Sequence, residues 1–188
     1  MNKTKQLVID SIFLGLLIVS SKISFPVGTI SFTLQVLVVL IIALLFPLKD
    51  SILICGVYLF MGLVLQLPVF STGGGIQYVL FPSFGFILGF IVCLTPVKLI
   101  DNMLSKKIDN KLICYLIASL IGLLIIYIFG LCYGFIIYKF YKGIDKTIME
   151  MLQIFILPFL VFDFGKVVLA AIISWRLQKI LFVKENHK

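Results

Sequence analysis

Residues 112–138 read LICYLIASLIGLLIIYIFGLCYGFIIY and contain no charged side chain. A helix that crosses a membrane needs about 20 consecutive, mostly apolar residues, and this stretch is longer than that. It therefore predicts a transmembrane helix. A transmembrane β-barrel would instead need repeated segments of about ten residues in which apolar and polar side chains alternate, and the sequence has no such repeat.

The composition of the whole chain supports the same interpretation. Of the 188 residues, 62% are hydrophobic and 13% are charged, and the mean hydropathy is +1.22. A soluble domain holds about 45–50% apolar and about 25% charged residues, and it could not bury this much apolar surface. A disordered chain is also excluded, because such chains are polar and poor in aromatic residues, whereas this one has 18 phenylalanines. We therefore expect an integral membrane protein.

Hydropathy and helix-breaking residues divide the chain into six predicted transmembrane helices within a single domain, residues 1–188. Pro26 and Gly28 interrupt the first connection, and residues 68–82 hold two prolines and three consecutive glycines without a charge. The expected fold is thus a compact, all-α bundle. The predicted helices cover residues 6–23, 32–47, 50–67, 82–104, 111–139 and 152–182.

The distribution of lysine and arginine predicts the orientation of this bundle. Six spans place both termini on one side of the membrane, together with eleven basic residues, and leave four on the other side. Because basic residues are enriched on the cytoplasmic side, both termini are expected in the cytoplasm of a multi-pass protein of the cell membrane. The eleven are Lys3, Lys5, Lys49, Lys98, Lys106, Lys107, Lys111, Arg176, Lys179, Lys184 and Lys188, and the four are Lys22, Lys139, Lys142 and Lys146.

Residues that usually build metal sites are scarce in this chain. The four cysteines, Cys55, Cys93, Cys114 and Cys132, stand singly in apolar runs, and the only histidine, His187, lies in the C-terminal tail. No CxxC or Cys/His spacing suits a metal ion. We expect no metal and no cofactor, and we interpret the cysteines as small packing residues.

Asp163 and Lys166 are the only charged residues between Ile154 and Trp175, within the stretch LVFDFGKVV. Their spacing of three places both on one face of a helix. A charge near the bilayer centre costs about 2.5–3.5 kcal/mol on insertion scales, so the pair should face a protein interior or a polar cavity. One interpretation is an ion pair that locks the bundle. The other is a ligand-binding site, because ionisable residues inside a membrane are usually functional.

A binding site built on this pair could recognise two kinds of ligand. A donor beside an acceptor suits a neutral group that carries both a carbonyl and an N–H. A lysine that acts alone would instead suit a carboxylate. The two residues by themselves leave both modes open.

Three further stretches are unusual for sequence embedded in lipid. They are PVGTISFTLQ at residues 26–35, YLFMG at 58–62 followed by LPVF at 67–70, and STGGG at 71–75 followed by FPSFGF at 81–86. In this order, and with the Asp-x-x-Lys of the last helix, they resemble the BioY family, the biotin-uptake S components of energy-coupling-factor transporters.

The sequence departs from the pattern of that family at several positions. Where the family has Gly-Pro-Thr-Gly-Gly-Tyr, residues 81–86 place phenylalanine at Phe81, Phe84 and Phe86. Where the family has Pro-x-Thr-x-Gln, Ser31 replaces the proline. The resemblance therefore implies biotin as the ligand, with another small vitamin such as lipoate as the alternative.

The resemblance implies a high-affinity binding subunit whose pocket lies near the extracellular face, beneath the 24–32 and 68–82 loops. Aromatic side chains would enclose the ring and alkyl chain of the ligand, and a few polar groups would fix its orientation. The substrate-binding residues implied in this way are Asp163, Lys166, Gln35, Thr33, Phe70, Gly74, Tyr78, Phe84 and Phe86.

The resemblance also implies partner proteins. The chain has no Walker motif, so ATP hydrolysis would come from two ATPase subunits that act through a transmembrane coupling subunit. In the first helix, Ser11 and Gly15 form a small-x-x-x-small pair at the position of the family's motif for that coupling subunit. Packing inside the bundle is the other interpretation of this pair. For Gly85 with Gly89 and for the pair at residues 130 and 134, we expect packing inside the bundle.

Two other classes of function remain as alternatives. An intramembrane enzyme would need a nucleophile with its base, or a metal cluster, within the membrane, and the sequence offers neither. A channel or an autonomous carrier of the inverted-repeat type would show internal repeats, and we find none. The chain is therefore expected to be a transport subunit and not an enzyme.

Overall fold

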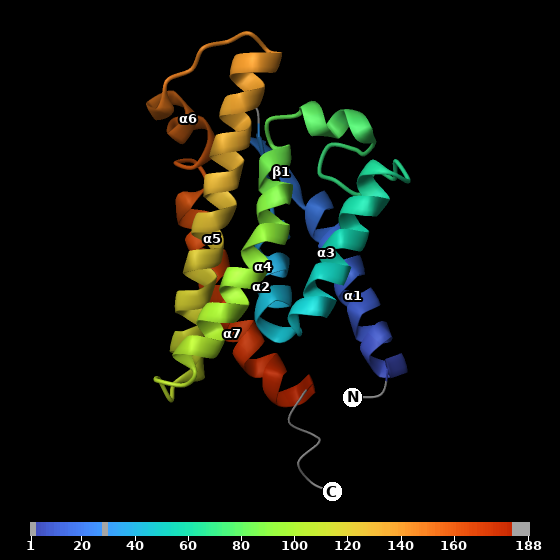
Figure 1. Ribbon diagram of the computed structural model, residues 1–188, viewed down its shortest axis with the longest axis vertical. Coiled ribbons are helices and arrows are strands. Elements are labelled where there is room, and N and C mark those ends of the chain that lie inside the picture. The colour runs from blue at the N-terminus through green and yellow to red at the C-terminus, as the bar shows by residue number, and fades with distance from the viewer. Residues whose placement is uncertain (1–2, 28–29, 182–188) are drawn as a thin grey trace, which may run out of the picture.

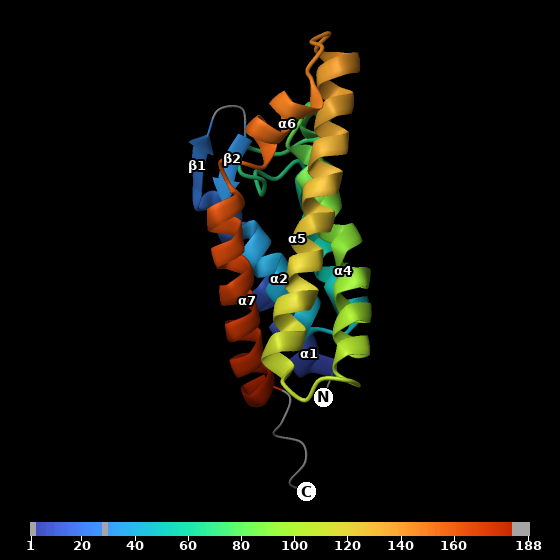
Figure 2. The same cartoon turned by 90° about the vertical axis from the view of Figure 1, so that its left-hand side faces the viewer.

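The computed structural model describes residues 3–27 and 30–181, which form a mostly helical bundle (Figures 1 and 2). Each of the six predicted ranges contains helix. The longer helices are α1 (Lys3–Lys22), α3 (Leu48–Leu63), α4 (Phe84–Leu104), α5 (Lys111–Ile136) and α7 (Leu160–Leu181). The shorter ones are α2 (Gln35–Leu45), α6 (Ile148–Phe155), the 3-10 helix η1 (Ile76–Leu80) and the π-helical turn η2 (Ile137–Tyr141), which continues α5.

Within the part of the chain that the structure describes, three helices are long and apolar enough to cross a membrane: α1, α4, and α5 together with η2. The pair α6 and α7 counts as a fourth if it forms one broken span, since the two are bent by 54°. The 11 residues of α2 span about 16 Å and the 16 residues of α3 about 24 Å. Both are shorter than the hydrocarbon core of about 30 Å. Length and composition thus support three or four spans directly.

Residues 24–27 and 30–33 form two paired strands, called the hairpin below, where the sequence predicted a loop within an all-α bundle. Strand β1 (Ser24–Val27) pairs antiparallel with β2 (Ile30–Thr33), and Ser24 lies opposite Thr33. Pro26 excludes the interior of a helix, and the aromatic and β-branched residues around it favour extended backbone. The hairpin leads directly into α2 and so fixes the position of Thr33.

The predicted last helix, 152–182, is in fact two helices. Pro158 lies between α6 and α7, where it cannot donate a backbone hydrogen bond and its ring would clash with the preceding turn of a continuous helix. Thr147 and Glu150 form a capping box that starts α6. Because α7 begins only at Leu160, Asp163 lies in its first turn, where the helix dipole favours a carboxylate.

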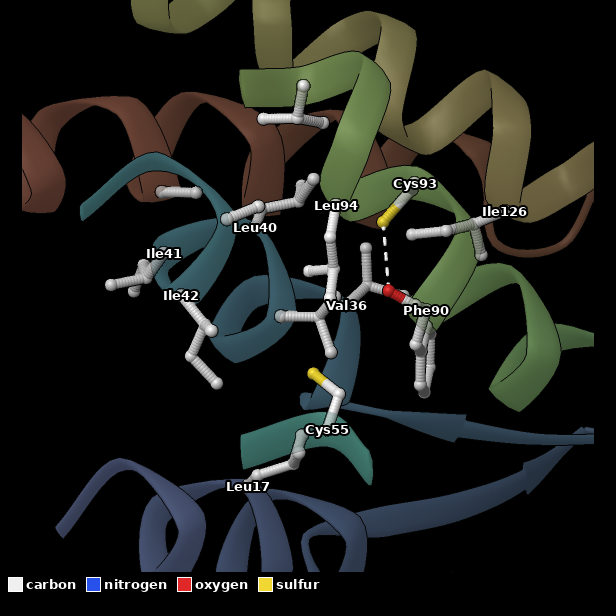
Figure 3. Close-up of a cluster of buried hydrophobic side chains, with 14 of the residues drawn as sticks. Leu17, Val36, Leu40, Ile41, Ile42, Cys55, Phe90, Cys93, Leu94 and Ile126 are labelled. Atoms are coloured by element: carbon white, nitrogen blue, oxygen red, sulfur yellow. Dashed lines mark hydrogen bonds between the residues drawn. The ribbon is translucent and has the colours of Figure 1, made fainter. Parts of the chain in front are cut away.

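The centre of the bundle is built around α2 (Figure 3). Leu40 and Ile42 are completely buried between the surrounding helices. Cys55 of α3 and Cys93 of α4 pack in the same cluster, and the Cys93 thiol donates to the carbonyl of Phe90 at 3.2 Å. Cys55, Cys93 and Cys114 are buried and Cys132 is exposed, and all four are free thiols. The three buried cysteines therefore act as small packing side chains, as predicted.

Glycines allow α4 and α5 to pack closely. A Cβ atom on Gly85 would lie 2.6 Å from the carbonyl oxygen of Phe129, and one on Gly89 would lie 2.9 Å from the Cα of Ile126. Gly130 similarly leaves room for the ring of Phe86. These contacts confirm the predicted packing role of the glycine pairs in the two helices.

The two ends of the bundle carry different elements. Helix α1 begins and α7 ends at the end that also holds the connection between α4 and α5 (Figures 1 and 2). The hairpin, η1 and α6 lie at the opposite end. The candidate site is found between these three elements and the helices below them.

Candidate functional site

A cavity lies where the hairpin, the η1 segment and α6 meet the ends of α2, α4, α5 and α7. The space between its lining atoms is about 570 Å³ when its opening to solvent is included. Its walls combine aromatic rings with a few polar groups. The lining residues are Ser31, Phe32, Thr33, Gln35, Val36, Ser71, Tyr78, Ser83, Phe86, Ile87, Phe90, Tyr127, Phe155, Phe159, Asp163 and Lys166.

Asp163 and Lys166 form a buried ion pair in the wall of this cavity. Each residue is 4% exposed, and the Lys166 Nζ lies 2.6 Å from the Asp163 Oδ1. The Tyr127 hydroxyl donates to the Asp163 Oδ2 at 2.6 Å, and the Lys166 Nζ also donates to the carbonyl of Thr33 at 2.6 Å. The ammonium group lies over the ring of Phe32, 3.7 Å from its centroid. Tyr127, Thr33 and Phe32 therefore help to stabilise two charges that would otherwise be costly to bury.

The pair keeps hydrogen-bonding capacity for a ligand. A lysine ammonium has three N–H donors, and Lys166 uses two of them on Asp163 and Thr33. Each carboxylate oxygen of Asp163 accepts one hydrogen bond, from Tyr127 or from Lys166, and can accept a second. The pair thus presents a donor next to an acceptor, with no net charge.

Further polar groups come from the β2–α2 junction and the η1 segment. The Gln35 side-chain amide lines the cavity, and its Nε2 lies 2.6 Å from the hydroxyl of Tyr58. The Tyr78 hydroxyl lies 3.2 Å from the Ser71 Oγ. Ser83 completes this polar wall.

Aromatic rings form the remaining walls. Phe155 of α6 stacks on Phe86 of α4 with the centroids 6.0 Å apart, and Phe159 stacks on Phe32 with the centroids 6.3 Å apart. Both stacks use the segment on either side of the Pro158 break. Helix α6 therefore closes one side of the cavity with its apolar face, which suits an apolar ring or an alkyl chain.

Six of the residues predicted for substrate binding line this one cavity, although they come from distant parts of the sequence. They are Thr33, Gln35, Tyr78, Phe86, Asp163 and Lys166.

The other three predicted residues lie outside the lining. Phe70 is completely buried behind Tyr78, with its ring centroid 4.5 Å from that of the tyrosine. Phe84 packs between Tyr78 and Tyr133. Gly74 lies so close to the carbonyl of Leu67 that a side chain would not fit. All three support the loop and η1 rather than line the cavity.

Several lining residues were absent from the sequence-based prediction. Tyr127 was missed because a tyrosine in an apolar helix usually packs against its neighbours. Only its polar hydroxyl could have indicated a role in the site. Phe155 and Phe159 were missed because a continuous last helix would not fold over the site. Pro158 was the sequence feature that could have indicated this break.

Ser11 and Gly15 lie on the outer face of α1, away from the cavity. Ser11 is exposed, and a Cβ atom built on Gly15 meets no other atom within 4 Å. Exposed apolar residues flank them, namely Leu7, Val8, Ile12, Leu16 and Val19. The pair therefore faces outward and does not pack against another of the described helices of the bundle.

Among residues 3–27 and 30–181, no three histidine, cysteine, aspartate or glutamate side chains are close enough together to hold a metal ion.

Comparisons with known proteins add three findings. The model of the BioY family matches residues 1–182. The biotin transporter BioY of Thermotoga maritima is 33% identical over 94% of this chain and 97% of its own length, and the probable biotin transporter BioY of Lysinibacillus sphaericus is 30% identical over 94% and 88%. The crystal structure of the S-component for biotin from an ECF-type ABC transporter superposes with a TM-score of 0.80 over 95% of this chain and 94% of that chain, at 22% identity.

Proposed function

The chain belongs to the BioY family, and on this premise we propose that it is the membrane subunit that binds biotin for uptake by an energy-coupling-factor transporter. The observation that carries this proposal is the neutral Asp163–Lys166 pair in the wall of the cavity. The ureido ring of biotin has one carbonyl and two N–H groups, so it can accept from Lys166 and donate to an acceptor beside it.

The geometry favours recognition of the ureido ring over recognition of a carboxylate by this pair. The charge of Lys166 is already balanced by Asp163 at 2.6 Å. A ligand carboxylate placed against Lys166 would therefore also approach a buried negative charge, which is unfavourable. A neutral carbonyl meets no such repulsion. The aromatic walls formed by Phe86 and Phe155 would enclose the ring and chain of the ligand.

The proposed orientation places both termini in the cytoplasm and the cavity on the outer side. The start of α1, the end of α7 and the α4–α5 connection share one end of the bundle (Figure 1), and Lys106, Lys107 and Lys111 lie at or beside that connection. Basic residues favour the cytoplasmic side. In this proposal the chain crosses the membrane six times, with α2 and α3 as short spans and with α6 and α7 as one broken span.

The proposed partners are a transmembrane coupling subunit and two ATPase subunits. The chain belongs to a transporter family, and the similar S-component comes from an ECF-type ABC transporter, which supports a proposal in which partner subunits hydrolyse ATP. The outer face of α1 around Ser11 and Gly15 is the surface proposed for the coupling subunit, because its small residues would let a second helix approach closely.

The test is equilibrium binding of radiolabelled biotin to the purified subunit, with lipoate as the competitor. We expect saturable binding that lipoate does not displace at equal concentration. The variants Asp163→Asn and Lys166→Met should remain folded, as judged by gel filtration and circular dichroism, but lose most of the binding. Absence of saturable binding below millimolar biotin would contradict the proposal, and variants that only misfold would show that the pair locks the bundle instead.

A further inference from the structure

Tyr58 of α3 lies behind the cavity wall and contacts one of its polar residues. It is 1% exposed and is not itself part of the lining. Its hydroxyl lies 2.6 Å from the Nε2 of Gln35 and 3.1 Å from the carbonyl oxygen of Val69. Gln35, Tyr58 and Val69 therefore form a chain of hydrogen bonds from the cavity to the loop after α3.

The chemistry of these groups fixes the direction of each bond. The carbonyl of Val69 can only accept, so the hydroxyl of Tyr58 donates its single proton there. The Val69 oxygen also accepts from the Ser21 Oγ at 2.5 Å, which its two lone pairs allow. The Tyr58 oxygen is then an acceptor toward Gln35. Of the two ends of the Gln35 amide, only the NH₂ group can donate to it.

This direction determines what Gln35 offers to a ligand. Its NH₂ group is held by Tyr58, so its carbonyl oxygen, Oε1, is the end left for the cavity that Gln35 lines. Among the residues that the structure describes, no group donates a hydrogen bond to this oxygen. At this position the cavity wall therefore offers a hydrogen-bond acceptor to a ligand that carries a donor.

We propose that Tyr58 is a positioning residue that holds Gln35 as a hydrogen-bond acceptor, so that the site selects ligands with an N–H group at this position. The inference rests on the proposed function, because the ureido ring of biotin supplies two such N–H groups. A ligand without the N–H would leave the Gln35 oxygen buried and unpaired. Sites of this kind reject such analogues strongly.

Two cyclic-carbamate analogues of biotin test this inference, since each replaces one ureido N–H by an ether oxygen with little change in shape. We expect the wild-type protein to bind biotin and to bind one of the two analogues at least about tenfold more weakly. In Tyr58→Phe the amide of Gln35 is free to turn and present its NH₂ group. The discrimination against that analogue should then fall by about three- to tenfold.

Tyr115→Phe is the matched control, because it also removes a tyrosine hydroxyl, which donates to the Gln178 side chain at 2.9 Å outside the cavity lining. It should change the affinities for biotin and for both analogues by the same factor. A purely structural role of Tyr58 would produce this uniform change as well.

The outcomes separate the inference from the function. Biotin binding with unchanged discrimination in a folded Tyr58→Phe variant overturns the role of Tyr58, and so does equal wild-type affinity for all three ligands. Failure of the wild-type protein to bind biotin overturns the proposed function and this inference with it. Nuclear Overhauser contacts between the Gln35 side-chain amide protons and the Tyr58 ring provide a measurement on the wild-type protein, and their absence also contradicts the inference.

Discussion

At the residue scale, Asp163 depends on two donors from different helices. Lys166 binds one carboxylate oxygen and Tyr127 binds the other, both at 2.6 Å. A hydrogen bond to a buried charged group contributes about 1.5–3 kcal/mol. Removing either donor therefore leaves part of a buried charge without compensation. We expect the affinity for biotin to fall more than the stability of the protein.

Tyr127→Phe tests this dependence. The variant removes the donor to the Asp163 Oδ2, so we expect the affinity for biotin to fall about tenfold or more, with a loss of stability of about 1.5–3 kcal/mol. Biotin binding and thermal unfolding measure the two effects.

Tyr115→Phe is the control for Tyr127→Phe. It removes a tyrosine hydroxyl that donates to the Gln178 side chain at 2.9 Å, outside the cavity lining. It should lower stability modestly and leave the affinity for biotin unchanged. Equal affinities of both variants and the wild type would contradict the role of Tyr127.

The sequence predicted the charged residues of the site better than its aromatic ones. Asp163 and Lys166 stand out because ionisable groups are rare and costly in an apolar helix. Tyr127 and Phe32 do not stand out, because the chain has 7 tyrosines and 18 phenylalanines and most aromatic side chains in a membrane protein simply pack. Phe70 shows the opposite case, because its predicted contact with the ligand stays a prediction while its buried ring packs against Tyr78, outside the cavity lining.

At the element scale, the loop between α3 and η1 is held by close packing at one glycine. The ring of Phe70 occupies the space where a side chain on Gly62 would lie. The backbone N–H of Gly75 also donates to the Gly62 carbonyl at 2.7 Å. This contact positions the segment that carries Ser71 and Tyr78 into the cavity.

Gly62→Ala should therefore displace Phe70 and destabilise the protein by about 1–3 kcal/mol. Gly56→Ala on the same helix is the control, because a Cβ atom there meets nothing within 4 Å and alanine is favoured over glycine in a helix by about 0.5–1 kcal/mol. In thermal unfolding of the isolated subunit, Gly62→Ala should lower the melting temperature and Gly56→Ala should raise it. A shift of the same sign and size in both would count against the packing argument.

The second element that shapes the site is α6, which begins with the Thr147–Glu150 capping box. Its Phe155 side chain closes the cavity. Thr147→Ala should fray the first turn at a cost of about 1 kcal/mol and raise the dissociation rate of biotin by up to about fivefold. Stopped-flow or filter-binding dissociation measures this rate.

Asn110→Ala is the control, because it removes a helix cap at the opposite end of the bundle. There the Asn110 side chain accepts a hydrogen bond from the backbone N–H of Leu112 at the start of α5. It should leave the dissociation rate unchanged. A rate that does not respond to Thr147→Ala, or that responds equally to both variants, would show that α6 does not retain the ligand.

The positions of the helices were predictable, but their interruptions were less so. Long apolar runs determine α1, α4 and α5 directly. The paired strands at 24–27 and 30–33 and the break between α6 and α7 depend on how these segments pack over a cavity, which hydropathy does not describe. Pro26 indicated an interruption without showing what replaces the helix, whereas Pro158 was included in a predicted continuous helix.

At the scale of the whole molecule, the cavity and the outer face of α1 are separate surfaces. The proposed function assigns the first to biotin and the second to the coupling subunit. Gly15→Leu should therefore preserve biotin binding and abolish co-purification with the coupling and ATPase subunits, because a large side chain prevents close helix approach.

Gly165→Leu is the control for this prediction, since a Cβ atom at Gly165 also meets nothing within 4 Å and the residue lies on α7. It should retain the complex. Co-purification of Gly15→Leu at the wild-type level would show that the coupling subunit binds elsewhere.

The central claim is that the Asp163–Lys166 pair holds biotin in the cavity, and native mass spectrometry of the freshly purified subunit tests it most directly. The account predicts that the wild-type protein carries one biotin per chain and that folded Asp163→Asn and Lys166→Met variants carry none. A different small molecule in the wild-type protein, or equal biotin occupancy in all three proteins, would contradict it.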